Sequence, residues 1–272
     1  MVQAKPVVVS PAARSPCPRL KPTMLGRSST SSTARRTTHG KGITKNTIRS
    51  LDYISMFILL SHVLDVSTPS FEGGPSLKIE PLKEIGAGAS SNSYTLTFPN
   101  HLGTHADAPK HVDERGKSLA EYPIEAFVFD RPILLDLPKG ESELILPSEL
   151  SEHEDEVAEA DLLLIRTGFQ KYRRSDPDRF MNRNPGFSEA AARYVSNFPR
   201  LRALGLDFIS LSAVQRREEG RAAHRALLSG RDFFVVEDMD LARCPRRPRR
   251  VIMVPLLVSG VDSAPCTVLA EV

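Results

Sequence analysis

The stretch HLGTHADAPKH, residues 101–111, constrains the fold more than any other, because it concentrates three of the chain's seven histidines in eleven residues. Gly103 and Pro109 disfavour a helix here, since both residue types destabilise a helix interior. We therefore expect a strand that ends in a tight loop at the proline. Alternate residues of a strand face one side of a sheet, which would bring three polar side chains together: His101, His105 and Asp107.

The same stretch has the composition of a metal site. Imidazole and carboxylate ligands together suit zinc, manganese or iron(II). A single histidine would more often hydrogen-bond in a core or face solvent, but this density favours metal binding over that alternative. No other stretch of the chain is comparable. The spacing predicts a metal site and leaves its purpose open.

The overall composition predicts a globular protein in a reducing compartment. The chain is 40% hydrophobic and 25% charged, which is ordinary for a globular domain. Its three cysteines, Cys17, Cys244 and Cys266, are too few and too scattered for a disulfide framework or a thiolate zinc site. The apolar run at residues 251–258 is too short to span a bilayer. We expect a cytoplasmic protein with no membrane partner.

The first 55 residues differ from the rest. They hold ten Lys or Arg and one acid, whereas the other 217 residues hold 26 basic and 32 acidic residues. We expect residues 1–55 to be a disordered basic leader, because the segment lacks apolar periodicity. An organellar transit peptide, a basic tail and a start-site artefact, with Met56 as the true start, all remain open. The basic charge lies in the leader, so we expect no nucleic-acid partner.

From residue 56 onward, strand-like and helix-like stretches alternate. Helices are predicted at 146–160, at 188–198 with Ser188 as N-cap, and at 218–230 with Gly230 as the stop. Pro132 predicts an edge strand or a bulge. Strand patterns occupy the segments between: 56–64, 76–85, 91–99, 127–138, 162–168, 201–210, 233–239, 251–260 and 264–272. This order predicts one α/β domain with mixed sheets over residues 56–272.

HLGTHADAPKH also resembles the HxGTHxDxPxH signature of the metal-dependent cyclase family, which includes bacterial kynurenine formamidases and isatin hydrolases. The resemblance continues through LLSHVL, LLLIRTGFQKY, NPGFSEAAARYV, LGLDFISLS, REEGRAAHRALLSG, VVEDMDL and VPLLVSGVDSAPCTVLAEV. It therefore covers nearly all of residues 57–272. It implies the swivelling β/β/α fold of that family.

The resemblance also implies a site. His101, His105 and Asp107 would bind one metal ion, and Asp107 would bridge to a second ion held by His224 and Glu237. The cofactor would be Zn²⁺ or Mn²⁺, with one or two ions per subunit. From the residues alone, Glu237 is unusual because a carboxylate at the end of the apolar run FFVV costs free energy unless it is paired or metal-bound. His224 is also unusual in its Ala/Leu-rich segment, and an ordinary helix histidine is the less favoured alternative.

The remaining implied roles concern chemistry. His111 resembles the general acid/base of the family, and the opening segment with His62 and Phe71 would line the mouth of the active site, although a core position for Phe71 is equally consistent. The implied activity is hydrolysis of a carbon–nitrogen amide bond, with an arylformamide such as N-formylkynurenine of tryptophan catabolism as the first expectation. A cyclic amide such as isatin and a non-catalytic metal-bound scaffold are the alternatives. A homo-oligomer, dimer or tetramer, is expected.

Overall fold

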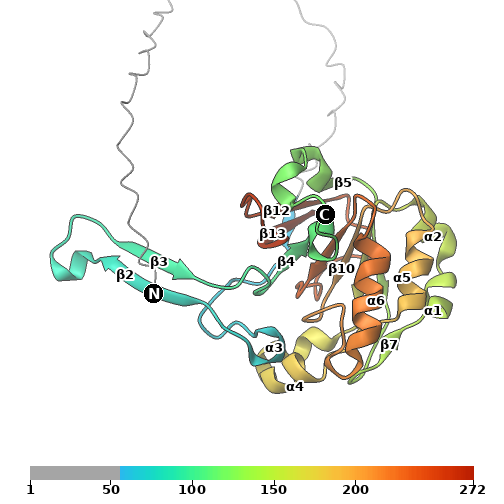
Figure 1. Cartoon of the computed structure of the whole chain (residues 1–272), viewed down its shortest axis with the longest axis horizontal. Helices are drawn as coiled ribbons and strands as arrows, with labels where there is room; N and C mark the ends of the chain where they lie inside the picture. The colour runs from blue at the N-terminus through green and yellow to red at the C-terminus, as the bar shows by residue number, and fades with distance from the viewer. Residues whose placement is uncertain (1–55) are drawn as a thin grey trace, which may run out of the picture. The chain divides into compact units, whose positions relative to one another are not determined.

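The computed structural model describes residues 56–272, so the predicted disordered leader lies outside the described residues. A nine-stranded sheet forms the centre, in the order β5-β12-β13-β4-β11-β10-β8-β6, with β1 paired to β13 (Figure 1). Its strands are β1 (Phe57–Leu59), β4 (His105–Asp107), β5 (Val128–Phe129), β6 (Pro132–Asp136), β8 (Leu162–Arg166), β10 (Ala203–Leu206), β11 (Phe234–Glu237), β12 (Arg250–Pro255) and β13 (Ser263–Glu271). Strands β6, β8, β10 and β11 are parallel, whereas the strands from β11 through β4 to β5 pair antiparallel. The predicted α/β fold with a mixed sheet is confirmed.

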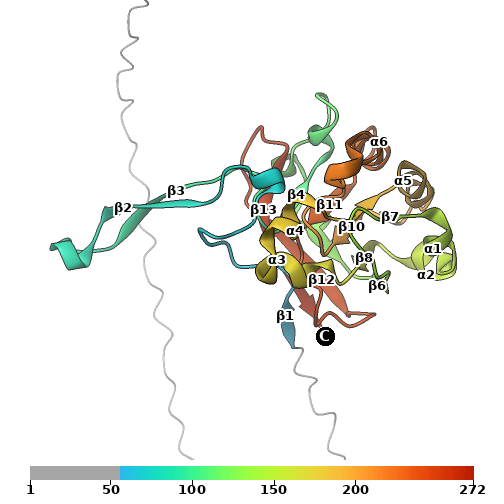
Figure 2. The ribbon, with the colours of Figure 1, turned by 90° about the horizontal axis from the view of Figure 1, so that it is seen from below.

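Helices cover one face of the parallel half. Figures 1 and 2 both place four of them on the same side of the sheet: α1 (Pro147–Ser151), α2 (Glu154–Glu159), α5 (Glu189–Ser196) and α6 (Arg217–Leu228). The short α3 (Tyr172–Ser175) and α4 (Pro177–Asn182) lie elsewhere on the body, and β7 (Leu144–Ile145) pairs with β9 (Gly186–Phe187) in a separate two-stranded sheet. None of the helices within residues 56–272 is long and apolar enough to cross a membrane.

Burial on both faces explains why the parallel strands are apolar along most of their length and carry charged residues only at their ends. Along β8, Leu163 and Ile165 join the cluster under the helices, while Leu162 and Leu164 join a second cluster on the other face. Successive strand residues point to opposite faces, so a strand that is covered twice needs apolar residues at every position. The second cluster also contains residues of β12 and β13.

Two predicted elements are divided in the structure. The helix predicted at 146–160 is interrupted at His153, whose φ of −123° and ψ of 20° are not helical, and becomes α1 and α2. The strand predicted at 127–138 becomes β5 and β6, which lie at opposite edges of the sheet. Between them the backbone N–H groups of Asp130 and Arg131 donate to the carboxylate of Asp161, which fixes the break. Pro132 begins the edge strand β6, as predicted.

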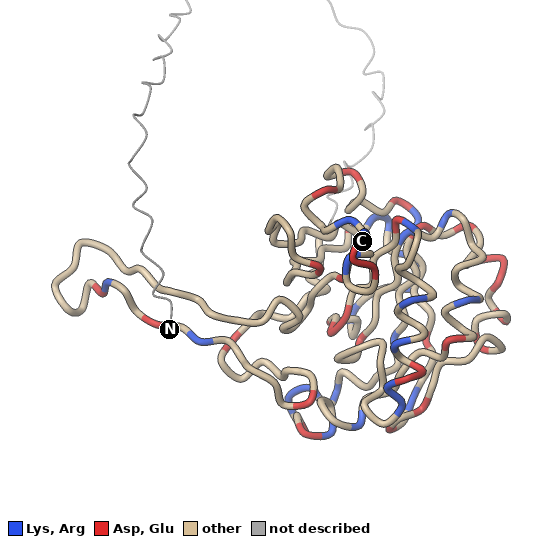
Figure 3. The backbone as a smooth tube through the Cα atoms, viewed as in Figure 1, with Lys and Arg blue, Asp and Glu red and all other residues tan. Residues whose placement is uncertain are grey.

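A hairpin extends away from the body. Strands β2 (Lys78–Lys83) and β3 (Ser93–Thr97) pair antiparallel and form what we call the arm, residues 78–97 (Figures 1 and 2). Directly opposite residues share a face, so the pairs Ile79–Leu96 and Pro81–Tyr94 make one apolar face. The opposite face is polar, and β3 itself carries no charged residue (Figure 3).

Candidate metal centre

Strand register brings together the polar residues of β4 and β11. Glu237 lies opposite His105, and Val235 lies opposite Asp107. Opposite residues of paired strands point to the same face, and residues two apart on one strand do so too. His105, Asp107 and Glu237 therefore converge at the middle of the sheet.

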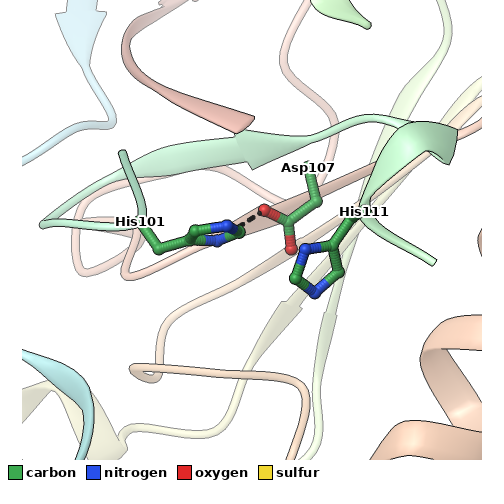
Figure 4. A group of neighbouring side chains, drawn as sticks. All are labelled: His101, Asp107 and His111. Atoms are coloured by element: carbon green, nitrogen blue, oxygen red, sulfur yellow. Dashed lines mark ion pairs between the residues drawn. The ribbon is translucent and has the colours of Figure 1, made fainter. Parts of the chain in front are cut away.

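His101 also lies at this centre, but it is not part of strand β4. Strand β4 contains only residues 105–107, so the expectation that His101 lies in the strand is wrong. It lies in a turn before Gly103, whose φ is +67° and whose added Cβ would stand 2.3 Å from Leu64 Cδ2. Only glycine fits such a position, and the turn that it permits brings His101 Nδ1 to 3.1 Å from Asp107 Oδ1 (Figure 4).

Backbone carbonyls orient two of the histidines. His105 Nδ1 lies 2.8 Å from the carbonyl oxygen of Gly103, and His224 Nδ1 lies 2.9 Å from that of Gly220. A carbonyl only accepts hydrogen bonds, so in the neutral ring each Nδ1 carries the proton and each Nε2 presents a lone pair. His105 Nε2 is 3.3 Å from Glu237 Oε2, and His224 Nε2 is 3.3 Å from Glu237 Oε1.

The carboxylate of Asp107 lies between the rings of His105 and His224 and has no hydrogen-bond partner within residues 56–272. His105 Nε2 is 3.6 Å from Asp107 Oδ1, and His224 Nε2 is 3.9 Å from Asp107 Oδ2. Both Asp107 oxygens and His105 Nε2 are buried without a hydrogen-bond partner in residues 56–272. Lone pairs facing carboxylates in a buried site repel unless a proton or a metal cation lies between them.

The ligand atoms fit a divalent cation. The structure gathers His105, Asp107 and Glu237 in one group and His101, Asp107 and His111 in another, and the ligand atoms of each group lie within 4.8 Å of one another. Figure 4 shows the second group. His224 adjoins the first group through the contacts given above. Nitrogen and carboxylate donors suit zinc, manganese or iron(II). Asp107 belongs to both groups, but their other members differ from the two ligand sets that the resemblance implies, because the structure places His111 with His101 and places His105 with Glu237.

The pKa values follow from the same contacts. Burial alone would lower the pKa of His101, but the nearby carboxylates of Asp107 and Asp262 outweigh burial and raise it to about 10. Burial alone would raise the pKa of Glu237, but the nearby imidazoles of His105 and His224 outweigh burial and lower it to about 2. The pKa of Asp107 is held far below its usual range, chiefly by His101 against the opposing effect of burial. Both carboxylates are therefore ionised, which is the form that binds metal.

Sequence reasoning missed Asp262, which lies just before β13. Its Oδ2 accepts from His111 Nδ1 at 2.8 Å and from His101 Nε2 at 3.0 Å, while its Oδ1 accepts from Asn100 Nδ2 at 2.7 Å. The only signal in the sequence is an acid before an apolar strand. The pairing of β13 with β4, which brings this acid to the histidines, joins segments more than 150 residues apart.

The centre opens into a cavity of about 450 Å³. Phe71, Val112 and Ile209 supply apolar walls, and Arg221 and Arg225 of α6 line another part. The predicted mouth residue Phe71 is therefore at the cavity, and His111 lines it too.

His62 is not among the residues that line this cavity. It lies in a separate groove with Val63 and Leu64, because its backbone N–H donates to Thr104 Oγ1 and its Nε2 lies 3.9 Å from Asp238 Oδ1. Thr104 Oγ1 in turn donates to the carbonyl oxygen of Asp238 at 2.5 Å. These bonds tie the start of β4 to the residue after Glu237.

A mixed α/β sheet with a buried histidine–carboxylate centre at its middle defines the class of protein. The family model described as "Putative cyclase" matches residues 58–213, more than half of the chain. The chain belongs to this cyclase family, which confirms the resemblance.

Individual relatives agree with this assignment. A kynurenine formamidase of Maricaulis maris is 27% identical over 209 residues, which cover 76% of this chain and 93% of that protein. The structure of an isatin hydrolase bound to the product analogue thioisatinate matches with a TM-score of 0.68 at 19% identity, covering 79% of this chain and 92% of that one. A predicted metal-dependent hydrolase from Bacillus stearothermophilus matches with a TM-score of 0.62 at 21% identity, covering 79% and 97%. The structural matches establish the fold.

Proposed function

We propose that the protein is a metal-dependent hydrolase of carbon–nitrogen amide bonds, and that its substrate is an arylformamide such as N-formylkynurenine. The observation that carries this proposal is the pair of buried Nε2 lone pairs, on His105 and His224, that face the carboxylates of Asp107 and Glu237. The kynurenine formamidase relative supports the substrate class. Zn²⁺ or Mn²⁺, one or two ions, is the proposed cofactor.

The proposed ligands are His101, His105 and Asp107 for one ion, with Asp107, His224 and Glu237 for a second. When bound, such an ion lowers the pKa of coordinated water from 15.7 to about 7 and polarises a carbonyl. The protein contributes a dry, rigid donor set, since the side chains of His105, Asp107 and Glu237 are at most 5% exposed.

His111 has the geometry of the proton carrier. Its side chain is 29% exposed and lines the cavity, in contrast to the enclosed His105. Its Nδ1 is bonded to Asp262, and its Nε2 has no hydrogen bond within residues 56–272. This nitrogen is therefore open to accept a proton from water and to return it to the leaving nitrogen of the amide.

The cavity suits a small aromatic amide. Its volume of about 450 Å³ falls in the range of small-molecule sites. Phe71 and Ile209 provide surfaces for an aryl ring, while His111 and the metal ligands provide the polar end. In the proposed pose the ring lies against Phe71 and the formyl group points to His111.

The test combines metal content with hydrolysis. The full chain, stripped of metal and reloaded with Zn²⁺ or Mn²⁺, is assayed with N-formylkynurenine and with isatin. Hydrolysis of the formamide supports the proposal, and isatin turnover alone would transfer it to cyclic amides. A protein that binds metal and hydrolyses neither would be the non-catalytic scaffold and would overturn it.

His111→Ala separates the base from the ligands. Turnover is expected to fall by about 10²- to 10⁴-fold, the contribution typical of a general base, while metal content is retained. His153→Ala is the matched control, because His153 lies between α1 and α2, does not line the cavity, and its side chain forms an ion pair with Glu156. Metal loss in proportion to activity loss in His111→Ala would make His111 a ligand instead.

We also propose that the protein is a homodimer joined through the arm. Ile79, Tyr94 and Leu96 on its apolar face are 46%, 49% and 56% exposed, and a two-stranded ribbon alone is marginally stable. Apolar residues are also exposed on the body at Leu256 and Leu257, both at 52%. A second copy of the chain carries both an arm and the exposed Leu256 and Leu257. In a two-fold dimer, each arm can therefore be covered by apolar residues of the other copy.

Light scattering at about 10 µM tests this dimer. The double variant Ile79→Ser/Leu96→Ser is expected to shift the mass to that of a monomer. Lys78→Ser/Thr97→Ser, on the polar face of the same ribbon, is expected to leave the dimer intact. A wild-type protein that is monomeric in this assay would refute the arrangement.

A further inference from the structure

Asp262 holds two histidines of the centre with one oxygen atom. Its Oδ2 lies 2.8 Å from His111 Nδ1 and 3.0 Å from His101 Nε2. Its own place is fixed by Asn100, which donates to Oδ1, and by the bond from the backbone N–H of Ala108 to the carbonyl oxygen of Asp262. The carboxylate therefore stands at the junction of β4 and β13.

We propose that Asp262 is a positioning residue that sets the tautomers of His101 and His111, so that one ring serves as a metal ligand and the other as a proton acceptor. This inference rests on the proposed function and adds a residue to it. Asp262 itself is neither the base nor a ligand in this assignment.

The tautomer of His111 follows from the acceptor. An ionised carboxylate only accepts hydrogen bonds, so the proton of the neutral ring must be on Nδ1. The lone pair is then on Nε2, which faces the cavity. Without Asp262 the ring would be free to rotate or to place its proton on Nε2, and in that form Nε2 could not accept a proton.

The same oxygen holds His101 by the other ring nitrogen, Nε2 instead of Nδ1. Here Nε2 donates to Asp262, so in the neutral ring the lone pair is on Nδ1, which is 3.1 Å from Asp107 Oδ1. In His105 and His224 the ring is likewise fixed by an acceptor on the nitrogen that faces away from Asp107. For those two rings the acceptors are the backbone carbonyls of Gly103 and Gly220.

Among the described residues, Asp262 is thus the one carboxylate that holds these rings, whereas the short contacts of His105 and His224 are to backbone carbonyls and Ser212 Oγ lies 3.4 Å from His224 Nδ1. A carboxylate makes stronger, charge-assisted hydrogen bonds than a carbonyl, and such partners increase the basicity of a ligating imidazole. It is also the only one of the three acceptors that a substitution can remove, because the other two belong to the backbone. The role is therefore open to a direct test.

The first test uses the metal-free full chain. Nitrogen-15 NMR of the ring nitrogens distinguishes Nδ1–H from Nε2–H tautomers without any substrate. The wild type is expected to show His111 as Nδ1–H and His101 as Nε2–H when the spectrum is recorded above about pH 10, where the His101 ring of the metal-free chain is neutral. In Asp262→Ala both rings are expected to become mixtures, while His105 and His224 stay as Nδ1–H. Unchanged tautomers in Asp262→Ala would overturn the proposal whether or not a substrate is known.

The second test measures metal affinity by chelator competition and turnover with the formamide. Removal of such an outer partner typically costs about 10- to 100-fold in metal affinity or activity. Asp262→Asn is expected to weaken the ion held by His101 and to lower kcat by that factor with little change in KM. It is also expected to shift the pH profile of kcat. Asp178→Asn, an exposed carboxylate on α4, is the control for loss of one negative charge.

The two tests separate the possible failures. Altered tautomers and weakened metal binding with no formamide turnover in any variant would refute the proposed function and support the role of Asp262. Wild-type affinity and pH profile in Asp262→Asn would overturn the role. Equal loss of both ions together with a loss of the folded NMR spectrum would make Asp262 a structural residue and would also overturn it.

Discussion

The buried ion pair between Arg173 and Asp238 offers the sharpest test of how the centre is supported. Arg173 Nε and Nη2 donate to Asp238 Oδ1 and Oδ2 at 2.7 and 2.8 Å. The two side chains are 5% and 2% exposed. Asp238 directly follows Glu237 and has a φ of +51°, so this pair fixes the point where β11 ends.

Arg173→Met is expected to lower the free energy of unfolding by about 3–5 kcal/mol. An exposed ion pair contributes about 0–1 kcal/mol, whereas removal of one partner from a buried pair leaves a charge without compensation and costs about 3–5 kcal/mol. Because neither side chain is more than 5% exposed, the larger range applies. Urea unfolding of the metal-free chain, with linear extrapolation, measures the difference.

A second substitution checks the cause. Asn at 238 tolerates the left-handed backbone conformation and carries no charge. The double variant Arg173→Met/Asp238→Asn is therefore expected to be more stable than Arg173→Met. A loss below about 1 kcal/mol in Arg173→Met, or a double variant no more stable than the single one, would refute the reasoning.

The pH dependence gives an independent check. Burial, with a further contribution from Arg173, lowers the pKa of His62, whose Nε2 is 3.9 Å from Asp238. Loss of Arg173 is expected to raise that pKa, so that protonated His62 partly replaces the missing charge. Because the folded-state pKa of His62 lies below the unfolded value of about 6.5, the wild type loses stability as the pH falls through that range, and a variant with a less depressed pKa loses less there. The deficit of Arg173→Met should therefore be smaller at pH 5.5 than at pH 8.

Three further predictions concern other parts of the chain. Gly220→Ala, which would stabilise an ordinary helix, is expected to destabilise the protein by about 1–3 kcal/mol in thermal or urea unfolding. The reason is that the added Cβ would lie 2.1 Å from Ser212 Oγ and 2.5 Å from Ser212 Cα, and a more stable variant would contradict this packing. Burial raises the pKa of Cys244 to about 12 and raises the pKa of Cys266 as well. Both thiols should therefore react with iodoacetamide at pH 8 far more slowly in the native protein than in urea. Peptide mass mapping of the alkylated protein measures the difference. Arg225 lines the cavity and has no ion pair within residues 56–272, so its guanidinium is free to bind a substrate carboxylate. Arg225→Gln is therefore expected to lower the preference for carboxylate-bearing over neutral arylformamides by about tenfold in kcat/KM. An unchanged ratio of kcat/KM values would exclude a contact between Arg225 and the substrate carboxylate.

Local patterns were enough to predict the elements of the fold, because strands and helices depend on residues near in sequence. They predicted the two strands that form the β2–β3 hairpin, the N-cap Ser188, which accepts from the N–H of Ala191, and the end of α6 near Gly230. Local reasoning was wrong at His101, where a glycine turn replaces the strand. It also could not separate β5 from β6, since their final neighbours are set by distant strands.

The residues of the candidate site also divide into those that local patterns predict and those that only the pairing of distant strands brings to the centre. His105 and Asp107 could be chosen from density and parity alone, since both belong to one short strand. His224 and Glu237 were assigned by the family resemblance, because α6 and β11 reach the centre only through the sheet order. Asp262 was missed, since its role depends on the pairing of β13 with β4. His62 was placed at the mouth, and the structure instead ties it to Thr104.

The position of β13 in the sheet has a consequence for synthesis of the chain. Residues 263–271 pair with β1, β4 and β12, and they follow all three in the sequence. While the ribosome is still adding earlier residues, these strands lack their central partner and expose open edges, which are sites of aggregation. Chaperone binding to nascent chains should therefore persist until residue 271 has emerged from the exit tunnel.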